Sequence, residues 1–239
     1  MMLSIIAVVI DNLEITQRFE SSIRQYTSGE YELIIIDNAS KDQNIINYLK
    51  EMADVHYRFD SMVSLAKAWN KGIALSKGKY VAVVNNDIVV PPDWFDLLKE
   101  TLENNKKAGL VSPITFWILR DMYFQYETYV NFDKTFKNPF QLETFKEVVW
   151  GEFLLFKREA LEAVGGYNEI YKNYSAEDLE INFQLYSKEY EIYIDPRVFV
   201  YHEGHATIKS REKEEAERIN NENFKLFKSR WPQYTQDWD

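Results

Sequence analysis

Continuous apolar runs that alternate with helix-periodic segments are the feature of this chain that most limits its fold. Residues 4–10 and 31–36 are β-branched apolar runs, and residues 15–26 between them carry apolar side chains at helical spacing. The same alternation continues to about residue 112. Strands and helices that alternate in this way form a mostly parallel sheet with right-handed crossovers. We therefore predict an α/β fold with a central sheet flanked by helices.

The pattern predicts the remaining elements in the order of the sequence. The expected helices are 43–52, 63–75, 92–104, 158–164, 178–188 and 209–230, and the expected strands are 55–59, 80–84, 109–112, 148–156 and 191–201. Residues 116–140 are rich in aromatic side chains without strict periodicity, which predicts irregular structure with short hairpins. We expect one domain over residues 1–208 and a C-terminal helical tail, 209–239, packed on it.

The charge balance argues against a nucleic-acid partner. The chain has 28 basic and 38 acidic residues, a formal net charge of −10, and such a surface repels phosphate backbones. Cysteine is absent, which excludes disulfides and thiolate metal sites. No apolar run approaches the length of about 18 residues that spans a membrane, so we expect a cytoplasmic protein. The tail mixes basic and apolar residues, and both packing on the domain and peripheral contact with anionic lipid remain open for it.

Two carboxylates are expected at the carboxyl ends of parallel strands. Asp37 closes the run 31–36, and Asp87 ends the segment Asn85-Asn86-Asp87 after the run 80–84. Open α/β sheets bind ligands at this edge, and a carboxylate oxygen suits Mg²⁺ or Mn²⁺ carrying a diphosphate. Asp37 can accept hydrogen bonds from a nucleotide base, although capping of the following helix is an equally good interpretation.

Several motifs, taken together, resemble those of family 2 glycosyltransferases. They are Ile34-Ile-Ile-Asp-Asn-Ala-Ser-Lys-Asp42, Ala68-Trp-Asn-Lys-Gly72, Asn85-Asn-Asp87, Val164-Gly-Gly-Tyr-Asn-Glu169 and Glu177-Asp178, which span about residues 3–205. The Asn-Asn-Asp form with trailing prolines is similar to the rhamnosyltransferase-like branch. The resemblance implies the GT-A fold and an inverting transfer of a sugar from a UDP- or dTDP-sugar to a hydroxyl of a saccharide or lipid-linked acceptor, in surface polysaccharide synthesis.

The resemblance also implies roles for individual residues. Asp87 and His202 would bind the metal, Mg²⁺ or Mn²⁺, and His202 fits this role better than His205 because it follows the predicted strand directly. Asp178 would be the general base that deprotonates the acceptor hydroxyl. Glu177 would form hydrogen bonds to hydroxyls of the donor or the acceptor. The residues expected to bind the nucleotide or donor sugar are Asp37, Asn38, Asn70, Asn85, Asn86 and Gly151. Gly151 is expected inside a strand, where a glycine marks either the close approach of a backbone or ligand or a β-bulge.

Two departures from the family pattern keep a non-catalytic alternative open. Asn85 replaces the first carboxylate of the family's Asp-x-Asp motif and brings no charge to a metal. Val9-Ile10-Asp11 stands where relatives often carry Thr-Tyr-Asn. A degenerate sugar-nucleotide-binding or scaffold protein is therefore the alternative. A dehydrogenase is disfavoured because no G-x-G-x-x-G follows a predicted strand, and a nucleotidyltransferase because residues 11–15 form no Gly-rich loop.

Overall fold

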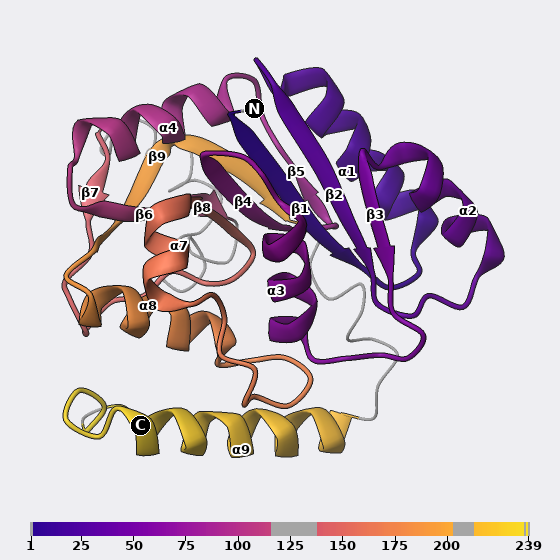
Figure 1. Ribbon diagram of the computed structural model, residues 1–239. Helices are drawn as coiled ribbons and strands as arrows, with labels where there is room; N and C mark the ends of the chain where they lie inside the picture. Colours follow the sequence, from indigo (N-terminus) through magenta and orange to yellow (C-terminus); the bar gives the residue numbers. More distant parts are fainter. Residues whose placement is uncertain (1, 116–137, 203–212, 237, 239) are drawn as a thin grey trace, which may run out of the picture.

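A single mixed sheet organises the part of the chain that the computed structural model describes, residues 2–115, 138–202, 213–236 and 238 (Figure 1). Its strand order is β3-β2-β1-β4-β8-β6-β9-β5, and β7 pairs with β9. The strands are β1 (Leu3–Val9), β2 (Tyr31–Asp37), β3 (Val55–Arg58), β4 (Tyr80–Asn85), β5 (Ile88–Val89), β6 (Ala108–Thr115), β7 (Phe140–Gln141), β8 (Phe153–Lys157) and β9 (Glu191–His202).

Helices cover both faces of this sheet (Figure 1). They are α1 (Leu13–Tyr26), α2 (Gln43–Met52), α3 (Leu65–Leu75), α4 (Trp94–Asn104), α7 (Arg158–Val164), α8 (Glu177–Ser187) and α9 (Lys213–Arg230). In β1, Ile6 and Val8 belong to the core cluster that includes residues of α3, α7, α8 and α9, whereas Ile5 and Ala7 belong to the cluster that includes residues of α1, α2 and α4. Successive strand residues point to opposite faces. Burial on both faces is therefore why the strands appear in the sequence as continuous apolar runs.

The sheet is parallel in its first half and mixed in its second. β1 pairs in parallel with both β2 and β4, and β2 with β3. β8 runs antiparallel to its neighbours β4 and β6, and β6 is parallel to β9. The predicted α/β class with a flanked central sheet is confirmed, but β8 departs from a mostly parallel arrangement.

Several element boundaries differ from the sequence-based expectations. The strand predicted over 148–156 begins at Phe153, so Gly151 lies in the turn before β8 and not inside a strand. α4 begins at Trp94, so Pro92 precedes the helix. The two-residue strands β5 and β7 were not predicted, because two residues give no periodic signal. Most of the predicted irregular region, residues 116–137, and residues 209–212 of the predicted tail helix lie outside the described residues.

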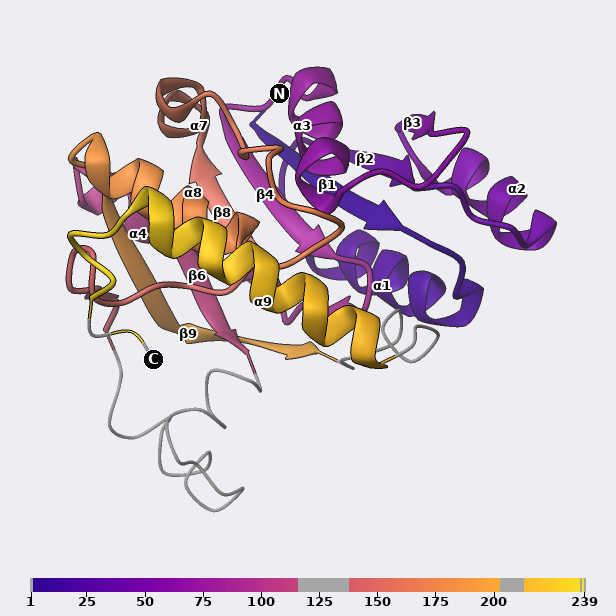
Figure 2. The same ribbon diagram turned by 90° about the horizontal axis from the view of Figure 1, so that it is seen from below.

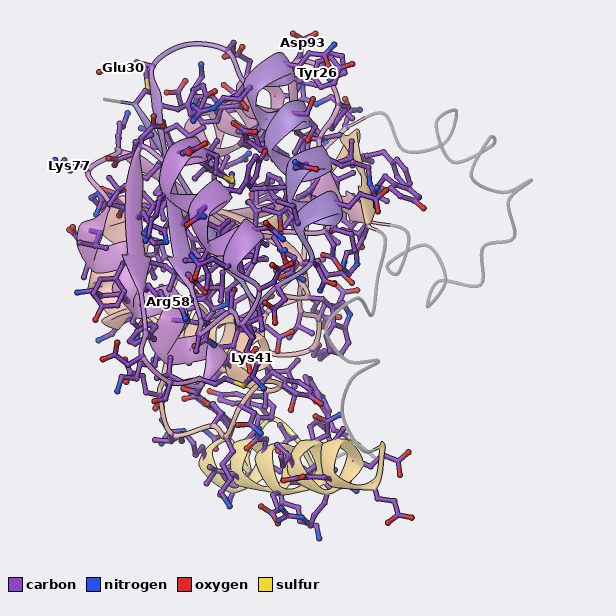
Figure 3. The ribbon with its side chains drawn as sticks, turned by 90° about the vertical axis from the view of Figure 1, so that its right-hand side faces the viewer. Tyr26, Glu30, Lys41, Arg58, Lys77 and Asp93 are labelled. Atoms are coloured by element: carbon purple, nitrogen blue, oxygen red, sulfur yellow. The ribbon has the colours of Figure 1, made fainter. Side chains whose placement is uncertain are left out.

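The carboxyl ends of the parallel strands face the side of the molecule where α9 lies. The arrows of β1, β2 and β3 point toward that side in Figure 1. Figure 3 shows Arg58, at the end of β3, and Lys41, after β2, at this end, and Glu30 and Lys77, which precede β2 and β4, at the opposite end. Figure 2 shows α9 running across the molecule on this side.

The C-terminal helix packs on the domain through one buried side. Phe227 is fully buried, and its ring meets that of Phe183 on α8 edge-on, with 5.0 Å between centroids. At the end of α9, Nε and Nη2 of Arg230 donate to Oε1 of the buried Glu180 at 2.9 and 2.8 Å. Protein contacts therefore occupy the apolar side of this helix. Within the described residues, no helix combines the length and the apolar character needed to cross a membrane.

Candidate functional site

A cavity of about 770 Å³ lies at the carboxyl ends of β1 and β4. Its walls come from segments far apart in the sequence, including the turns after β2 and β4, the start of α8, the end of β9 and one side of α9. Most of the residues predicted for the site line this cavity. They are Asn38, Asn85, Asn86, Asp87, Gly151, Glu177, Asp178 and His202.

Asp87, His202 and Glu152 meet at one wall of the cavity. Nε2 of His202 lies 3.0 Å from Oδ1 of Asp87, and Nδ1 lies 3.4 Å from Oε1 of Glu152. The antiparallel pairing of β5 with β9, in which Ile88 is opposite His202, brings these side chains together. Burial lowers the pKa of His202, but the two carboxylates outweigh this and raise it to about 9. The imidazole is therefore a cation held between two acids in the absence of a metal.

This wall fits a divalent metal that shares its coordination with a substrate. Among the described residues, no group of three or more acidic or histidine side chains could hold a metal by itself. However, Oδ1 of Asp87 and Nδ1 of His202 are buried without a hydrogen-bond partner, because the contacts between these side chains lack hydrogen-bond geometry. Mg²⁺ and Mn²⁺ commonly use one or two protein ligands and take further oxygens from a substrate phosphate. Asp87 and His202 are suitable as that protein contribution.

Glu177 and Asp178 open α8 and also line the cavity. Oδ2 of Asp178 accepts the backbone N–H of Gly151 at 3.1 Å, and Oδ1 accepts that of Leu179 at 2.9 Å. A Cβ at position 151 would lie 3.1 Å from Cβ of Asp178, so a glycine permits this close approach. The close neighbour of Gly151 is thus the side chain of Asp178, and the backbone at Gly151 is a turn.

Burial makes both acids of this pair hold their protons more strongly than usual. Burial and the nearby charge of Asp178 raise the pKa of Glu177 to about 8. Burial also raises the pKa of Asp178, while the backbone N–H groups of Gly151 and Leu179 lower it. Oε2 of Glu177 is buried without a hydrogen-bond partner. At neutral pH Glu177 is therefore protonated and can donate a hydrogen bond, while the two backbone N–H groups favour the ionised form of Asp178.

The turn that leads into α8 has an unusual backbone held in place by α9. Ser175 and Ala176 have φ angles of 78° and 65°, a left-handed conformation that costs non-glycine residues roughly 1–2 kcal/mol each. The buried Asn223 of α9 accepts the N–H of Lys172 at 3.0 Å. Its Nδ2 donates to the carbonyls of Lys172 and Tyr174 at 2.8 and 3.0 Å. These bonds fix the turn and hence the position of the acid pair that follows it.

Asp37 was predicted to contact the nucleotide base, but it does not line the cavity. Its carboxylate is fully buried, with Oδ1 accepting the N–H of Ser40 at 2.8 Å and Oδ2 paired with Arg58. The neighbouring Asn38 does line the cavity and exchanges two hydrogen bonds with the backbone of Val63, at 3.0 and 2.9 Å. In the structure the buried carboxylate of Asp37 therefore stabilises the turn after β2.

Asn70 is the second predicted donor residue outside the cavity lining. Its Nδ2 donates to the carbonyl of Tyr167, and its Oδ1 accepts the N–H of the same residue, both at 2.8 Å. Tyr167 itself lines the cavity. The Ala68-Trp-Asn-Lys-Gly72 and Val164-Gly-Gly-Tyr-Asn-Glu169 motifs are thus joined, and Asn70 acts on the site through Tyr167.

Several lining residues were missed by the sequence analysis. Glu152 directly follows the predicted site residue Gly151, and this adjacency was the signal that could have identified it. The exposed Trp150, Trp69, and the α9 residues Asn220, Asn221 and Phe224 also line the cavity. The α9 residues carried no usable signal, because their place depends on how the tail packs.

Replacement of Glu177 by Gln is expected to raise the thermal stability at alkaline pH. The folded pKa is about 8, against about 4.3 for an exposed glutamate. Between these values the folded protein holds a proton that the unfolded chain has lost, so stability falls as the pH rises through this window. Calorimetry should show Tm about 5 °C above wild type near pH 8.5 and little difference near pH 4.5. The exposed Glu162→Gln is the control, and a Tm gain equal at both pH values would contradict the assignment.

Comparison with known proteins adds an independent result. Residues 4–165 match the family model described as glycosyl transferase family 2. A stretch of 165 residues is 27% identical to the glucosyl-dolichyl phosphate glucuronosyltransferase of Haloferax volcanii, covering 64% of this chain and 52% of that protein. The uncharacterized protein y4gI of Sinorhizobium fredii is 23% identical over 252 residues, covering 96% of this chain and 27% of that protein. The chain thus spans about half or less of the length of these relatives.

Solved structures of low sequence identity share the fold. GalNAc-T7 with UDP, GalNAc and Mn²⁺ superposes with a TM-score of 0.67 at 16% identity, over 84% of this chain and 43% of that chain. Mannosyltransferase PcManGT from Pyrobaculum calidifontis, in complex with GDP-Man and Mn²⁺, gives 0.65 at 19% identity, over 86% and 57%. S. aureus TarS gives 0.64 at 13% identity, over 84% and 36%. The predicted GT-A fold is confirmed.

Proposed function

Because the chain belongs to glycosyl transferase family 2, we propose that it transfers a sugar, with inversion, from a UDP- or dTDP-sugar to a hydroxyl of a saccharide acceptor. The observation that carries this proposal is that two chemically different pairs of side chains share one cavity. The acid pair Glu177 and Asp178 and the pair Asp87 and His202 line the same cavity. A leaving diphosphate needs positive charge, and an attacking hydroxyl needs a base. Asp178 is suited to act as the base, and a metal held by Asp87 and His202 would supply the positive charge.

The wall at Asp87 is the proposed place of the donor diphosphate. Asp87 and His202 would hold Mg²⁺ or Mn²⁺ together with the diphosphate. The metal, when bound, would offset the negative charge that develops on the nucleotide diphosphate as it leaves. The amides of Asn85 and Asn86 line the same wall and can bond to hydroxyls of the donor. Two structures of the same fold contain Mn²⁺ together with UDP or GDP-Man, which supports a nucleotide donor bound with a divalent metal.

The wall at Asp178 is the proposed place of the reaction with the acceptor. Asp178 takes the proton of the acceptor hydroxyl while that oxygen forms a bond to the anomeric carbon of the donor. The bond from that carbon to the diphosphate oxygen breaks, and its electrons leave with the nucleotide. Attack from the side opposite the nucleotide inverts the anomeric centre in one step. The protonated Glu177 donates a hydrogen bond that orients a sugar hydroxyl.

A nucleotide screen followed by a turnover measurement tests this function. UDP, dTDP and GDP, with and without Mn²⁺, are compared by thermal shift, where a ligand at 100 times its Kd stabilises by about 2.7 kcal/mol. We expect UDP or dTDP to raise Tm with Mn²⁺ present, and the matching nucleotide sugar to be hydrolysed or transferred. The neutral Asn85 supports the alternative, a degenerate binding protein. Nucleotide binding without transfer or hydrolysis of any donor would establish that alternative.

A further inference from the structure

We propose that α9 forms the acceptor subsite of the cavity and that this subsite binds an uncharged saccharide ring. The inference rests on the proposed glycosyl transfer and names a substrate class for the same site. Asn220, Asn221 and Phe224 line the cavity that Glu177 and Asp178 also line. Residues 220 and 224 are one helical turn apart and share a side of the helix. α9 lies outside residues 4–165, the part that matches the family model.

The side of α9 next to these lining residues packs on the domain and holds them near Glu177 and Asp178. Ile219, Asn223 and Phe227 are buried at four-residue spacing, so they form the side that faces the domain. The hydrogen bonds of Asn223 reach the carbonyls of Lys172, Tyr174 and Ser175, directly ahead of the acid pair. Asn220 and Phe224 therefore lie beside the entrance to α8, where the acceptor hydroxyl must approach Asp178.

A second network of hydrogen bonds, centred on Glu180, joins the end of α9 to α8. Oε1 of Glu180 accepts two bonds from Arg230, and Oε2 accepts Nε1 of Trp231 at 2.8 Å and the hydroxyl of Tyr171 at 2.7 Å. Glu180 is fully buried, and every one of these bonds is charge-assisted. The wall formed by α9 is therefore held at two points relative to Asp178, which suits a preformed subsite.

The exposed chemistry of this wall fits a sugar. The side-chain amides of Asn220 and Asn221 can each donate and accept, as hydroxyl groups require. Phe224 and the exposed Trp150 supply apolar ring surface for the C–H face of a sugar ring. A few polar groups among apolar ones is the usual composition of a small-molecule pocket.

The charge of the cavity selects against an anionic acceptor. The acidic residues of the lining are Asp87, Glu152, Glu177 and Asp178. His202 lies between two of them, and the described lining contains no lysine or arginine. Among the described lining residues the carboxylates of Asp87, Glu152 and Asp178 outnumber the one cation, His202. A carboxylate or phosphate on the acceptor ring would therefore meet an excess of like charge, which costs binding energy. An uncharged ring has no such cost.

Variants of α9 test the subsite by separating acceptor from donor effects. Asn220→Ala removes the amide, and Phe224→Leu removes the ring while keeping an apolar side chain. The exposed Lys225→Ala on the same helix, outside the cavity lining, is the matched control. The probes are the donor identified by the nucleotide screen and a panel of neutral methyl glycosides, with the matching uronic acid glycosides. We expect each site variant to raise the acceptor KM about tenfold, with the donor Kd, donor hydrolysis and the Lys225→Ala variant unchanged.

Every other result would overturn the assignment. An unchanged acceptor KM removes α9 from the subsite, and a raised donor Kd with unchanged acceptor KM places α9 at the nucleotide. Equal or better transfer to uronic acid glycosides refutes the uncharged class. Donor hydrolysis without transfer to any neutral glycoside of the panel also refutes it, while leaving the proposed glycosyl transfer chemistry in place. Failure of the wild type to bind or hydrolyse any nucleotide sugar would remove the proposed function, and the subsite with it.

Discussion

Replacement of Asp178 by Asn is expected to lower glycosyl transfer by about 10² to 10⁴-fold, the usual contribution of a positioned base. Asn is nearly the same size and can still accept one of the two backbone N–H bonds that hold Asp178, but it cannot take a proton from the acceptor hydroxyl. The loss should appear mainly in kcat, because the proton transfer matters only in the transition state. The measurement is initial-rate kinetics with the donor and a saccharide acceptor.

Donor binding and the product's stereochemistry serve as controls for this variant. Donor affinity with Mn²⁺ should equal that of the wild type, since Asp87 and His202 are untouched. NMR of the wild-type product should show the anomeric configuration opposite to that of the donor. Wild-type turnover in Asp178→Asn would show that Asp178 is not the base. A product with the anomeric configuration of the donor would contradict the single-displacement mechanism.

Replacement of Asp87 by Ala is expected to weaken metal-dependent nucleotide binding by at least about 100-fold. Asp87 is the one charged side chain of the Asn85-Asn86-Asp87 segment, and its Oδ1 is buried without a hydrogen-bond partner beside His202. Its loss removes the carboxylate that would hold the metal on the diphosphate. Calorimetric titration with UDP or dTDP, with and without Mn²⁺, measures the effect.

An acidic residue that is close to Asp87 in the sequence but distant from the site provides the matched control. Asp93 is exposed six residues further along the chain, and Figure 3 shows it at the opposite end of the molecule from Arg58. Asp93→Asn should leave the affinity and its metal dependence unchanged. If Asp87→Ala bound nucleotide with wild-type affinity and the same response to Mn²⁺, the metal site would lie elsewhere.

The fold class was predictable because its signals are local. Runs such as 33–36 are apolar at every position because β2 is buried on both faces, and helices such as α2 repeat their apolar residues with the helical period. The convergence of Asp37 and Asp87 on one crevice was predicted from the shared edge of the parallel strands, and the structure places Asp87 in the cavity lining while the adjacent Asn38, and not Asp37, lines it after β2. The contacts of Asp37 and Asn70 were not predictable, because their partners Arg58 and Tyr167 lie 21 and 97 residues away.

The sequence by itself determined the alternation of strands and helices and the residue types at the strand ends, because burial and hydrogen bonding along one element depend on consecutive residues. The tertiary structure decided which segments meet. The pairing of β5 with β9 brings His202 to Asp87, although β5 is too short to leave a sequence signal. The packing of α9 on α8 makes Asn220 and Phe224 part of the cavity. Such contacts join residues far apart in the chain, and no local pattern encodes them.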